Sequence, residues 1–181
     1  WDNGRSVLHL GDRIIVDGQA RASNKQLENS SYYYQRLIEL KGPNLSKPLP
    51  KKEAEEIAKI AAKFLWETQG SAMLVTGWIA LAPICGILDW RPHMWLTAGA
   101  GSGKSTLLED FIAPLLGDMR LIVVGNTSEA GIRQSLKADA LPVVFDEAES
   151  NEKPDQARIQ SILSLARVAS FETDANILKG S

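Results

Sequence analysis

The chain has 181 residues, of which 44% are hydrophobic and 23% are charged, a balance typical of a globular protein with one core or one and a half domains. Its formal net charge of −2 excludes a global attraction to nucleic acid or to an anionic membrane, although a local basic surface remains open. The single cysteine, Cys85, excludes a disulfide framework, and its apolar surroundings favour a buried thiol over a nucleophile.

Neither end of the chain has the features of a natural terminus. The chain begins at Trp1 without a methionine or a signal-like segment, and it stops abruptly at Ser181. It contains no internal repeat and no low-complexity tract. We therefore expect a piece of a longer, cytoplasmic polypeptide.

The first segment, residues 1–50, is predicted to be a β-hairpin followed by a linker. Two strand-like runs, 6–10 and 13–16, flank Gly11-Asp12, and a two-residue connection that begins with glycine favours a hairpin. The next turn is expected at Asp17-Gly18.

The linker, residues 23–50, is polar and irregular, with one short helix expected around 32–40. Three tyrosines at 32–34 stand next to Arg36 and could stack on nucleic-acid bases. Packing of two of the three against the protein is the simpler interpretation.

The second segment, residues 51–90, is predicted to be helical and to pack on the core. A helix is expected over 51–69, since apolar residues recur at helical spacing at Ile57, Ile60, Ala61, Phe64 and Leu65. The run 71–88 carries no charge and is long enough for a membrane span. Because it contains Gly77, Pro83 and Gly86, we expect instead a buried helix that breaks near Pro83, and no membrane partner.

The third segment, residues 91–181, alternates between strands and helices. Strands are predicted at 93–97, 120–124 and in the apolar run that begins at 140, and helices are predicted at 104–116, 129–138 and 154–169. Pro114 indicates a distortion or an early end of the first of these helices. This alternation predicts an α/β fold with a parallel sheet covered by helices on both faces.

The connection between the first strand and its helix has the spacing of a phosphate-binding loop, with Ala98 where glycine is usual. Glycines allow backbone amides to wrap a phosphate, and such a loop still closes if Ala98 needs no positive φ. Lys104 would reach the β- and γ-phosphate oxygens, and the Ser105 hydroxyl would ligate Mg²⁺. The expected nucleotide-binding residues are Ala98, Gly99, Ala100, Gly101, Ser102, Gly103, Lys104, Ser105 and Thr106. A glycine-rich turn that binds nothing is the alternative.

Two acids, Asp146 and Glu147, close the apolar run that begins at 140. Acids at the carboxyl end of a parallel strand lie where open α/β sheets bind ligands. Asp146 would anchor Mg²⁺, and Glu147 would be the catalytic base that polarises the attacking water. Two surface acids at the start of the next helix are the alternative. Together with the loop, the acids predict a site that binds ATP with Mg²⁺ and hydrolyses it.

The loop after the second strand, residues 125–129, has the composition of a helix cap. It lies at the carboxyl edge of the predicted sheet, so Asn126, Thr127 and Glu129 could contact substrate or a neighbouring subunit. Simple helix capping is the alternative interpretation.

The acid pair follows Lys104 by about forty residues, with one strand and one helix between them. In this respect the chain resembles the ATPases that have an additional strand and a catalytic glutamate, which include the AAA+ group and the superfamily 3 helicases. Residues 85–105 and 128–134, together with the acids, resemble the ATPase part of phage- and prophage-encoded primase-helicases. The resemblance covers roughly residues 70–181. It implies a P-loop NTPase fold, a three-layer sandwich that is incomplete at its C-terminal end, with the motifs named Walker A and Walker B.

The same resemblance implies a DNA-replication motor that acts on single-stranded DNA as a homo-oligomeric ring. A ring of this kind needs an arginine from a neighbouring subunit; Arg133, Arg158 and Arg167 could serve, but a surface ion pair explains each more simply. Residues 171–181, with Lys179-Gly180, fall where that family has a DNA-contacting hairpin, and an ordinary turn is the alternative. An assembly or switch ATPase that does not translocate is the alternative function.

Overall fold

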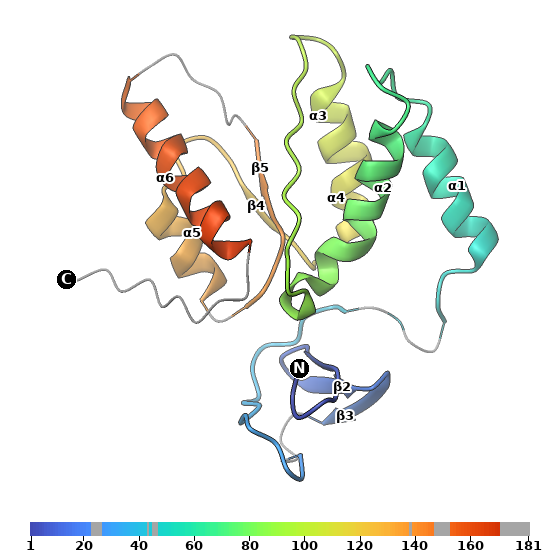
Figure 1. Ribbon diagram of the computed structural model, residues 1–181, viewed down its shortest axis with the longest axis vertical. Helices are drawn as coiled ribbons and strands as arrows, with labels where there is room; N and C mark the ends of the chain where they lie inside the picture. The colour runs from blue at the N-terminus through green and yellow to red at the C-terminus, as the bar shows by residue number, and fades with distance from the viewer. Residues whose placement is uncertain (23–26, 43, 45–46, 138, 147–152, 171–181) are drawn as a thin grey trace.

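The computed structural model of the chain describes residues 1–22, 27–42, 44, 47–137, 139–146 and 153–170. Figure 1 shows a small antiparallel sheet at one end of the molecule, below two groups of elements that stand side by side. One group is a set of helices, and the other is a parallel strand pair with two helices.

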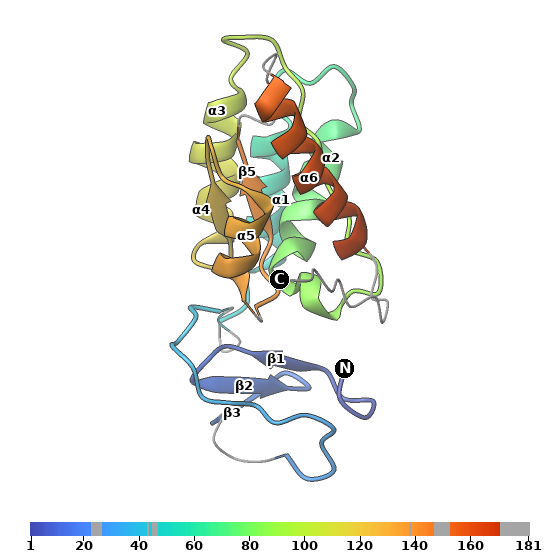
Figure 2. The same ribbon diagram turned by 90° about the vertical axis from the view of Figure 1, so that its left-hand side faces the viewer.

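The N-terminal sheet is a three-stranded meander, β1 (Val7–His9), β2 (Arg13–Val16) and β3 (Gln19–Ala22), in the order β1-β2-β3 (Figure 2). Both neighbouring pairs are antiparallel, so the hairpin predicted in this region is confirmed and gains a third strand. The turn between β2 and β3 places Asp17 and Gly18 at φ 48° and 80°, as a two-residue turn with both central residues left-handed requires.

The short helix expected around 32–40 is wrong. This segment instead bonds to the turn of the sheet, with the Leu37 amide donating to the Gly11 carbonyl (2.9 Å) and the Leu40 amide to the Leu10 carbonyl (3.0 Å). A Cβ atom at Gly11 would lie 1.8 Å from the Ile38 carbonyl oxygen, so the two backbones touch where only glycine fits. The carbonyls of the turn therefore take the amides that a helix would have used.

Asp2 is fully buried and ties the linker to the sheet. Its carboxylate accepts hydrogen bonds from the Ser30 hydroxyl (2.6 Å), the Ser31 amide (2.9 Å) and the Tyr34 hydroxyl (3.2 Å), and Arg5 lies 3.4 Å away. The hydrogen bonds from Ser30 and then Ser31 hold the pKa of the Asp2 carboxyl below its ordinary value.

The tyrosines around this anchor differ from the expectation that two of the three pack. Tyr34 is half-buried because its hydroxyl reaches Asp2, whereas Tyr32 and Tyr33 are 60% and 82% exposed.

The helical group begins with α1 (Lys51–Ala61) and α2 (Ser71–Leu81). The first helix ends well before residue 69. At its end the Ala61 carbonyl accepts from the Phe64 amide (3.3 Å) and from the Trp66 indole N–H (2.7 Å). Leu65, expected on the apolar face, is fully exposed.

The predicted break near Pro83 is confirmed, since α2 continues as a 3₁₀ turn, η1 (Ala82–Ile87), with non-helical backbone angles at Ile84. Within the described residues, no helix has the length and apolar character that crossing a membrane requires.

The helix predicted at 104–116 is confirmed as one continuous run of α3 (Lys104–Thr106), η2 (Leu107–Ile112) and α4 (Ala113–Leu116). Its middle part is a π-helix, in which the Ala113 amide donates to the carbonyl of Leu108, five residues back. Pro114 has no amide hydrogen, and its ring would clash with the preceding turn of a regular α-helix, so the wider turn directly before it accommodates the ring.

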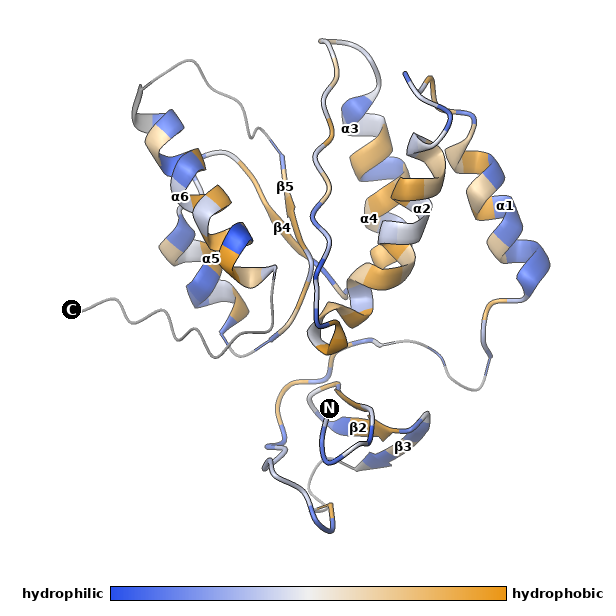
Figure 3. Ribbon diagram, viewed as in Figure 1, coloured by the Kyte–Doolittle hydropathy of each residue, from blue (hydrophilic) through white to orange (hydrophobic). Residues whose placement is uncertain are grey.

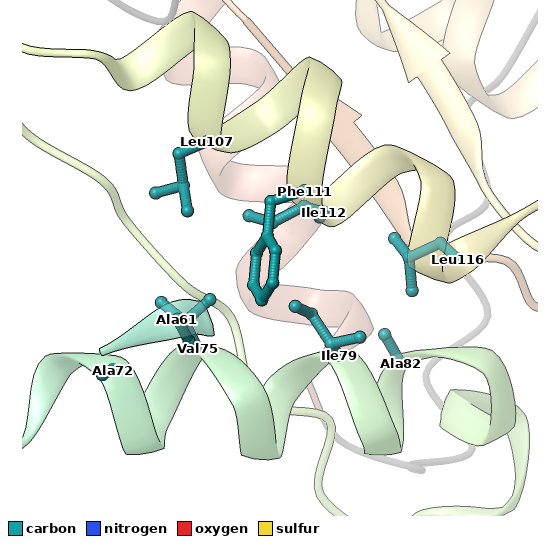
Figure 4. Close-up of a cluster of buried hydrophobic side chains, with 9 residues drawn as sticks. All are labelled: Ala61, Ala72, Val75, Ile79, Ala82, Leu107, Phe111, Ile112 and Leu116. Atoms are coloured by element: carbon teal, nitrogen blue, oxygen red, sulfur yellow. The ribbon is translucent and has the colours of Figure 1, made fainter. Parts of the chain in front are cut away.

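The π-helix also decides which side chains this run buries. In a regular α-helix, Ile112 would lie about 140° around the axis from Leu107, at about 100° per residue. With the wider turn, both join Phe111 in the same cluster, where each is at most 7% exposed. Figure 4 shows these side chains facing those of α2 and η1, and the full cluster comprises Ala61, Ala72, Val75, Ile79, Ala82, Leu107, Phe111, Ile112 and Leu116.

The second group holds the parallel pair β4 (Leu121–Val123) and β5 (Val143–Phe145), with α5 (Glu129–Leu136) and α6 (Lys153–Ala169) beside it. The predicted parallel relation of these strands and both predicted helices are confirmed. A separate core of Val123, Ile132 and Ile162 joins them. Figure 3 shows hydrophobic residues along α2, α4 and the strand pair, and hydrophilic residues on the outer part of α1.

The strand predicted at 93–97 is wrong as a sheet member, because no described strand pairs with it. The segment keeps the alternation of a strand, with Met94 and Leu96 packed on the helical core and Trp95 exposed. Within the described residues the parallel sheet therefore has two strands, and the three-layer sandwich with a larger central sheet stays a prediction.

We predict that replacing Phe111 with alanine lowers the free energy of unfolding by about 3–5 kcal/mol, because it empties the centre of the core beside Phe64, whose ring lies 5.6 Å away. Chemical denaturation followed by tryptophan fluorescence measures this loss. The control is Leu65→Ala, which changes an exposed side chain and should stay within about 0.5 kcal/mol of the wild type. Equal losses in the two variants would contradict this core.

We also predict that the N-terminal sheet loses stability in acid through Asp2. A lowered pKa in the folded chain gives stability that is fully present above the unfolded pKa of about 3.9 and is lost as the pH falls through the folded value. Urea denaturation between about pH 6 and pH 2 should show a flatter pH dependence for Asp2→Asn than for the wild type. Asp89→Asn, at an exposed site, is the control, and an unchanged slope in Asp2→Asn would overturn the role of Asp2.

Candidate functional site

The glycine loop, defined as residues 98–103, turns sharply before the long helical run. Gly101 and Gly103 have φ values of 74° and 87°, in the left-handed region that side chains disfavour. The Ser102 amide donates to the Gly99 carbonyl (3.2 Å), which closes the turn. Ala98 does not have a positive φ, so alanine can stand where glycine is usual without backbone strain.

The space beside the glycine loop is open. A Cβ atom built on Gly99, Gly101 or Gly103 would meet no atom within 4 Å. The loop residues are exposed. A ligand could therefore approach the backbone of this loop closely, as a phosphate must in order to bind amides.

The first turn of α3 presents unused hydrogen-bond donors. The first helical bond runs from the Leu107 amide to the Gly103 carbonyl (2.9 Å), so no backbone bond of the described residues uses the amides of residues 104–106. The Lys104 side chain is half-buried and forms no ion pair or hydrogen bond with a described residue. Helix N-terminal amides next to an unpaired ammonium group favour an anion.

The predicted acid strand ends at the same end of the molecule as the glycine loop. Figures 1 and 2 both place the carboxyl ends of β4 and β5 and the start of α6 at the end where α3 begins. Asp146 directly follows β5, is half-buried, and its amide donates to the Val123 carbonyl (3.4 Å). Neither Lys104 nor Ser105 bonds to Asp146 within the described residues. Glu147 and residues 171–181, with Lys179-Gly180, lie outside the described residues.

The oxygens of Ser105 and Asp146 suit Mg²⁺, a hard cation that would take its other ligands from phosphate and water. In the part of the chain that the structure describes, no three His, Cys, Asp or Glu side chains are grouped as a metal site of their own. Mg²⁺ in nucleotide sites needs only one or two protein oxygens, because phosphates and water supply the others. Ser105 is exposed on the first turn of α3 and Asp146 directly follows β5, and Figure 1 places the start of α3 and the end of β5 at the same end of the molecule.

Most polar side chains of the loop after β4 form bonds within the loop or with the helix that follows it. Thr127 donates to the Val124 carbonyl (2.8 Å), and the Ser128 hydroxyl accepts from the Gly131 amide (3.2 Å) as the cap of α5. Glu129 pairs with Arg133 (2.8 Å). Capping therefore accounts for the polar side chains of residues 127–129.

Asn126 is the exception in this loop. It is exposed, and its side chain makes no hydrogen bond with a described residue. It follows β4 at the same edge as Asp146, so its amide group remains available to a ligand.

The three arginines named as possible trans-acting groups have different surroundings. Arg133 forms the surface ion pair expected of it, and Arg167 is exposed without an ion pair to a described residue. Arg158 forms an ion pair with Asp155 (3.4 Å) as expected, but its side chain is only 16% exposed and also bonds to backbone carbonyls of its own chain. Sequence reasoning missed this role, since its spacing on the helix gives no sign of a partner some thirty residues away.

Cys85 has the features of an inert thiol. It is half-buried, and its S–H donates to the Ala140 carbonyl (3.3 Å). Burial raises the pKa of the Cys85 thiol, which lowers the fraction of the nucleophilic thiolate.

No protein-family model, no curated protein and no solved structure matched the chain. The likeness to helicase-type ATPases therefore stands on the motifs alone. The chain itself provides a left-handed glycine loop with open space beside it, an unpaired lysine and an acid at the same end.

We predict that Gly103→Ala lowers the free energy of unfolding by about 1–2 kcal/mol, because alanine is strained at positive φ even where space is open. Gly99→Ala should cause no loss, since Gly99 has neither a positive φ nor a close neighbour. Thermal and chemical denaturation of the two variants check this difference. Equal stability of the two would show that the loop does not hold the left-handed turn.

Proposed function

We propose that the chain is a P-loop ATPase module that binds ATP through residues 98–106 and hydrolyses it. The observation that carries this proposal is the left-handed glycine loop with open space beside it, directly before a helix whose first amides are unused. A glycine-rich turn that binds nothing would not need to keep both the space and the donors free.

The residues of the loop bind the phosphates. The backbone amides of the loop and of Lys104 would surround the β-phosphate, and the Lys104 ammonium would lie against the β- and γ-phosphate oxygens. Leu107, only 5% exposed, fixes this turn to the core, so the donors are held in place before the ligand arrives.

The acids act on the terminal phosphate. Ser105 and Asp146 would hold Mg²⁺, which neutralises phosphate charge when it is bound with the nucleotide. Glu147, next to Asp146 in the sequence, would orient the attacking water and accept its proton. The assignment of Glu147 rests on its place in the sequence.

The wider role follows from the resemblance to the ATPase part of phage- and prophage-type primase-helicases. We propose that hydrolysis drives movement on single-stranded DNA during DNA replication, with the module working as a homo-oligomeric ring. The rival is a nucleotide-dependent assembly or switch ATPase, which hydrolyses ATP without moving along DNA.

Lys104→Ala is expected to weaken ATP binding about 10- to 100-fold, because it removes one charge-assisted contact of about 1.5–3 kcal/mol. Titration calorimetry with MgATP measures the affinity. The control is Lys63→Ala, an exposed lysine beyond the end of α1, which should bind as the wild type does. Wild-type affinity in Lys104→Ala would refute the phosphate-loop assignment.

Glu147→Gln is expected to keep ATP affinity and to lower turnover at least about 100-fold, because it removes the general base alone. Phosphate release should be measured with and without single-stranded DNA. Stimulation by DNA that the substitution abolishes supports the motor. A turnover rate that does not change when DNA is added favours the switch. A wild-type turnover rate in Glu147→Gln would rule out Glu147 as the base.

A further inference from the structure

Arg158 of α6 is bound from several sides at the carboxyl edge of the parallel strands. One guanidinium nitrogen, Nη1, donates to the Gly125 carbonyl (2.6 Å) and to the Thr127 carbonyl (3.2 Å). The other, Nη2, lies 3.4 Å from a carboxylate oxygen of Asp155. The guanidinium carbon also lies 5.9 Å from the centre of the Phe145 ring.

These contacts connect the carboxyl ends of the two strands, which lie at the same end of the molecule as the glycine loop. Gly125 and Thr127 belong to the loop after β4, and Phe145 is the last residue of β5, directly before Asp146. A second link joins the same two strands, because the amide of Asp146, directly after β5, donates to the carbonyl of Val123, the last residue of β4. Arg158 thus fixes the loop after β4, the end of the acid strand and α6 in one arrangement.

Burying the charge of Arg158 costs free energy, which is recovered only where each donor of the guanidinium has a partner. Only 16% of the Arg158 side chain is exposed, and its Nε–H is buried without a partner among the described residues. A buried guanidinium with an unused donor gives less stability than a well-packed apolar side chain would. A requirement for fixed geometry at the strand ends accounts for the arginine better than stability does.

We infer that Arg158 is a positioning residue that locks the loop after β4 to the acid-bearing end of β5, so that Asp146 and Asn126 keep their places at the end of the molecule where the glycine loop lies. This inference rests on the proposed ATPase function. It also removes Arg158 from the candidates for a trans-acting arginine, because both terminal nitrogens of its guanidinium are engaged within its own chain and its Nε–H is buried.

Two substitutions test the role. Arg158→Lys keeps the charge and the aliphatic stem but has one terminal nitrogen instead of two, so it cannot bond the two carbonyls through one nitrogen and Asp155 through another, and Arg158→Gln removes the charge. Both should lower ATP turnover at least about tenfold, because a small misplacement of a reacting group has a large effect on rate. ATP affinity should stay within about threefold of the wild type, since the glycine loop is intact.

Hydrogen exchange of the full chain supplies the second readout. The amides of residues 125–127 and of Asp146 should exchange faster in both variants, whereas those of the core helices α2 and η2 should not change. Arg21→Gln, an exposed arginine on β3, is the control and should match the wild type in all three measurements.

The outcomes separate this inference from the proposed function. Wild-type turnover in both variants, or unchanged exchange at 125–127, would overturn the role of Arg158 and leave the ATPase proposal intact. A parallel loss of ATP affinity and of core protection would also overturn it, because the substitution would then act on the whole fold. Failure of the wild-type chain to bind ATP would overturn the proposed function and this role with it.

Discussion

Leu107, Phe111 and Ile112 hold the helical run after the glycine loop against Val75 and Ile79 of α2, and each of the five is less than a tenth exposed. Full burial of one such side chain contributes about 1.5–3 kcal/mol to the free energy of unfolding. This seam, the packing of the five side chains between the two helical runs, is therefore the main source of stability on which the loop depends. The seam starts three residues after Lys104, which means that the first helical turn cannot shift without opening the core. The geometry of the loop is therefore set by apolar packing behind it, and the glycines only permit the turn that the packing requires.

The other half of the candidate site depends on polar contacts. β4 and β5 are short, and the parallel pair that they form ends at the loop that holds Asn126 and at Asp146. Here the bonds of Arg158 and of the Asp146 amide add to the core of Val123, Ile132 and Ile162, which has fewer buried residues than the helical core. The glycine loop and the acid-bearing strand end are thus supported by different interactions, so under the proposed function substitutions should separate binding from turnover.

Much of the fold and of the loop could be predicted from the sequence, because local signals dominate there. Glycines at positions that need positive φ, the cap at Ser128 and the break at Pro83 act within a few residues, and the structure has each of them. Two of the failures involve distant partners. The segment 32–40 bonds to the Gly11 turn instead of coiling, and Arg158 is bound by carbonyls more than thirty residues away. The early end of α1 is a local failure, where Trp66 bonds back to Ala61. The strand predicted at 93–97 has the right alternation, but alternation does not specify a pairing partner.

Hydrogen exchange at the backbone amides of residues 99–107, with and without MgADP, tests the central claim most directly. Amides that bind phosphate become protected, and within this segment the amides of residues 104–106 form no backbone bond with a described residue in the free chain. The account predicts slower exchange concentrated in this segment when MgADP is present, and no such slowing in Lys104→Ala at the same nucleotide concentration. Unchanged exchange in this segment at saturating MgADP, or equal protection in Lys104→Ala, would contradict it.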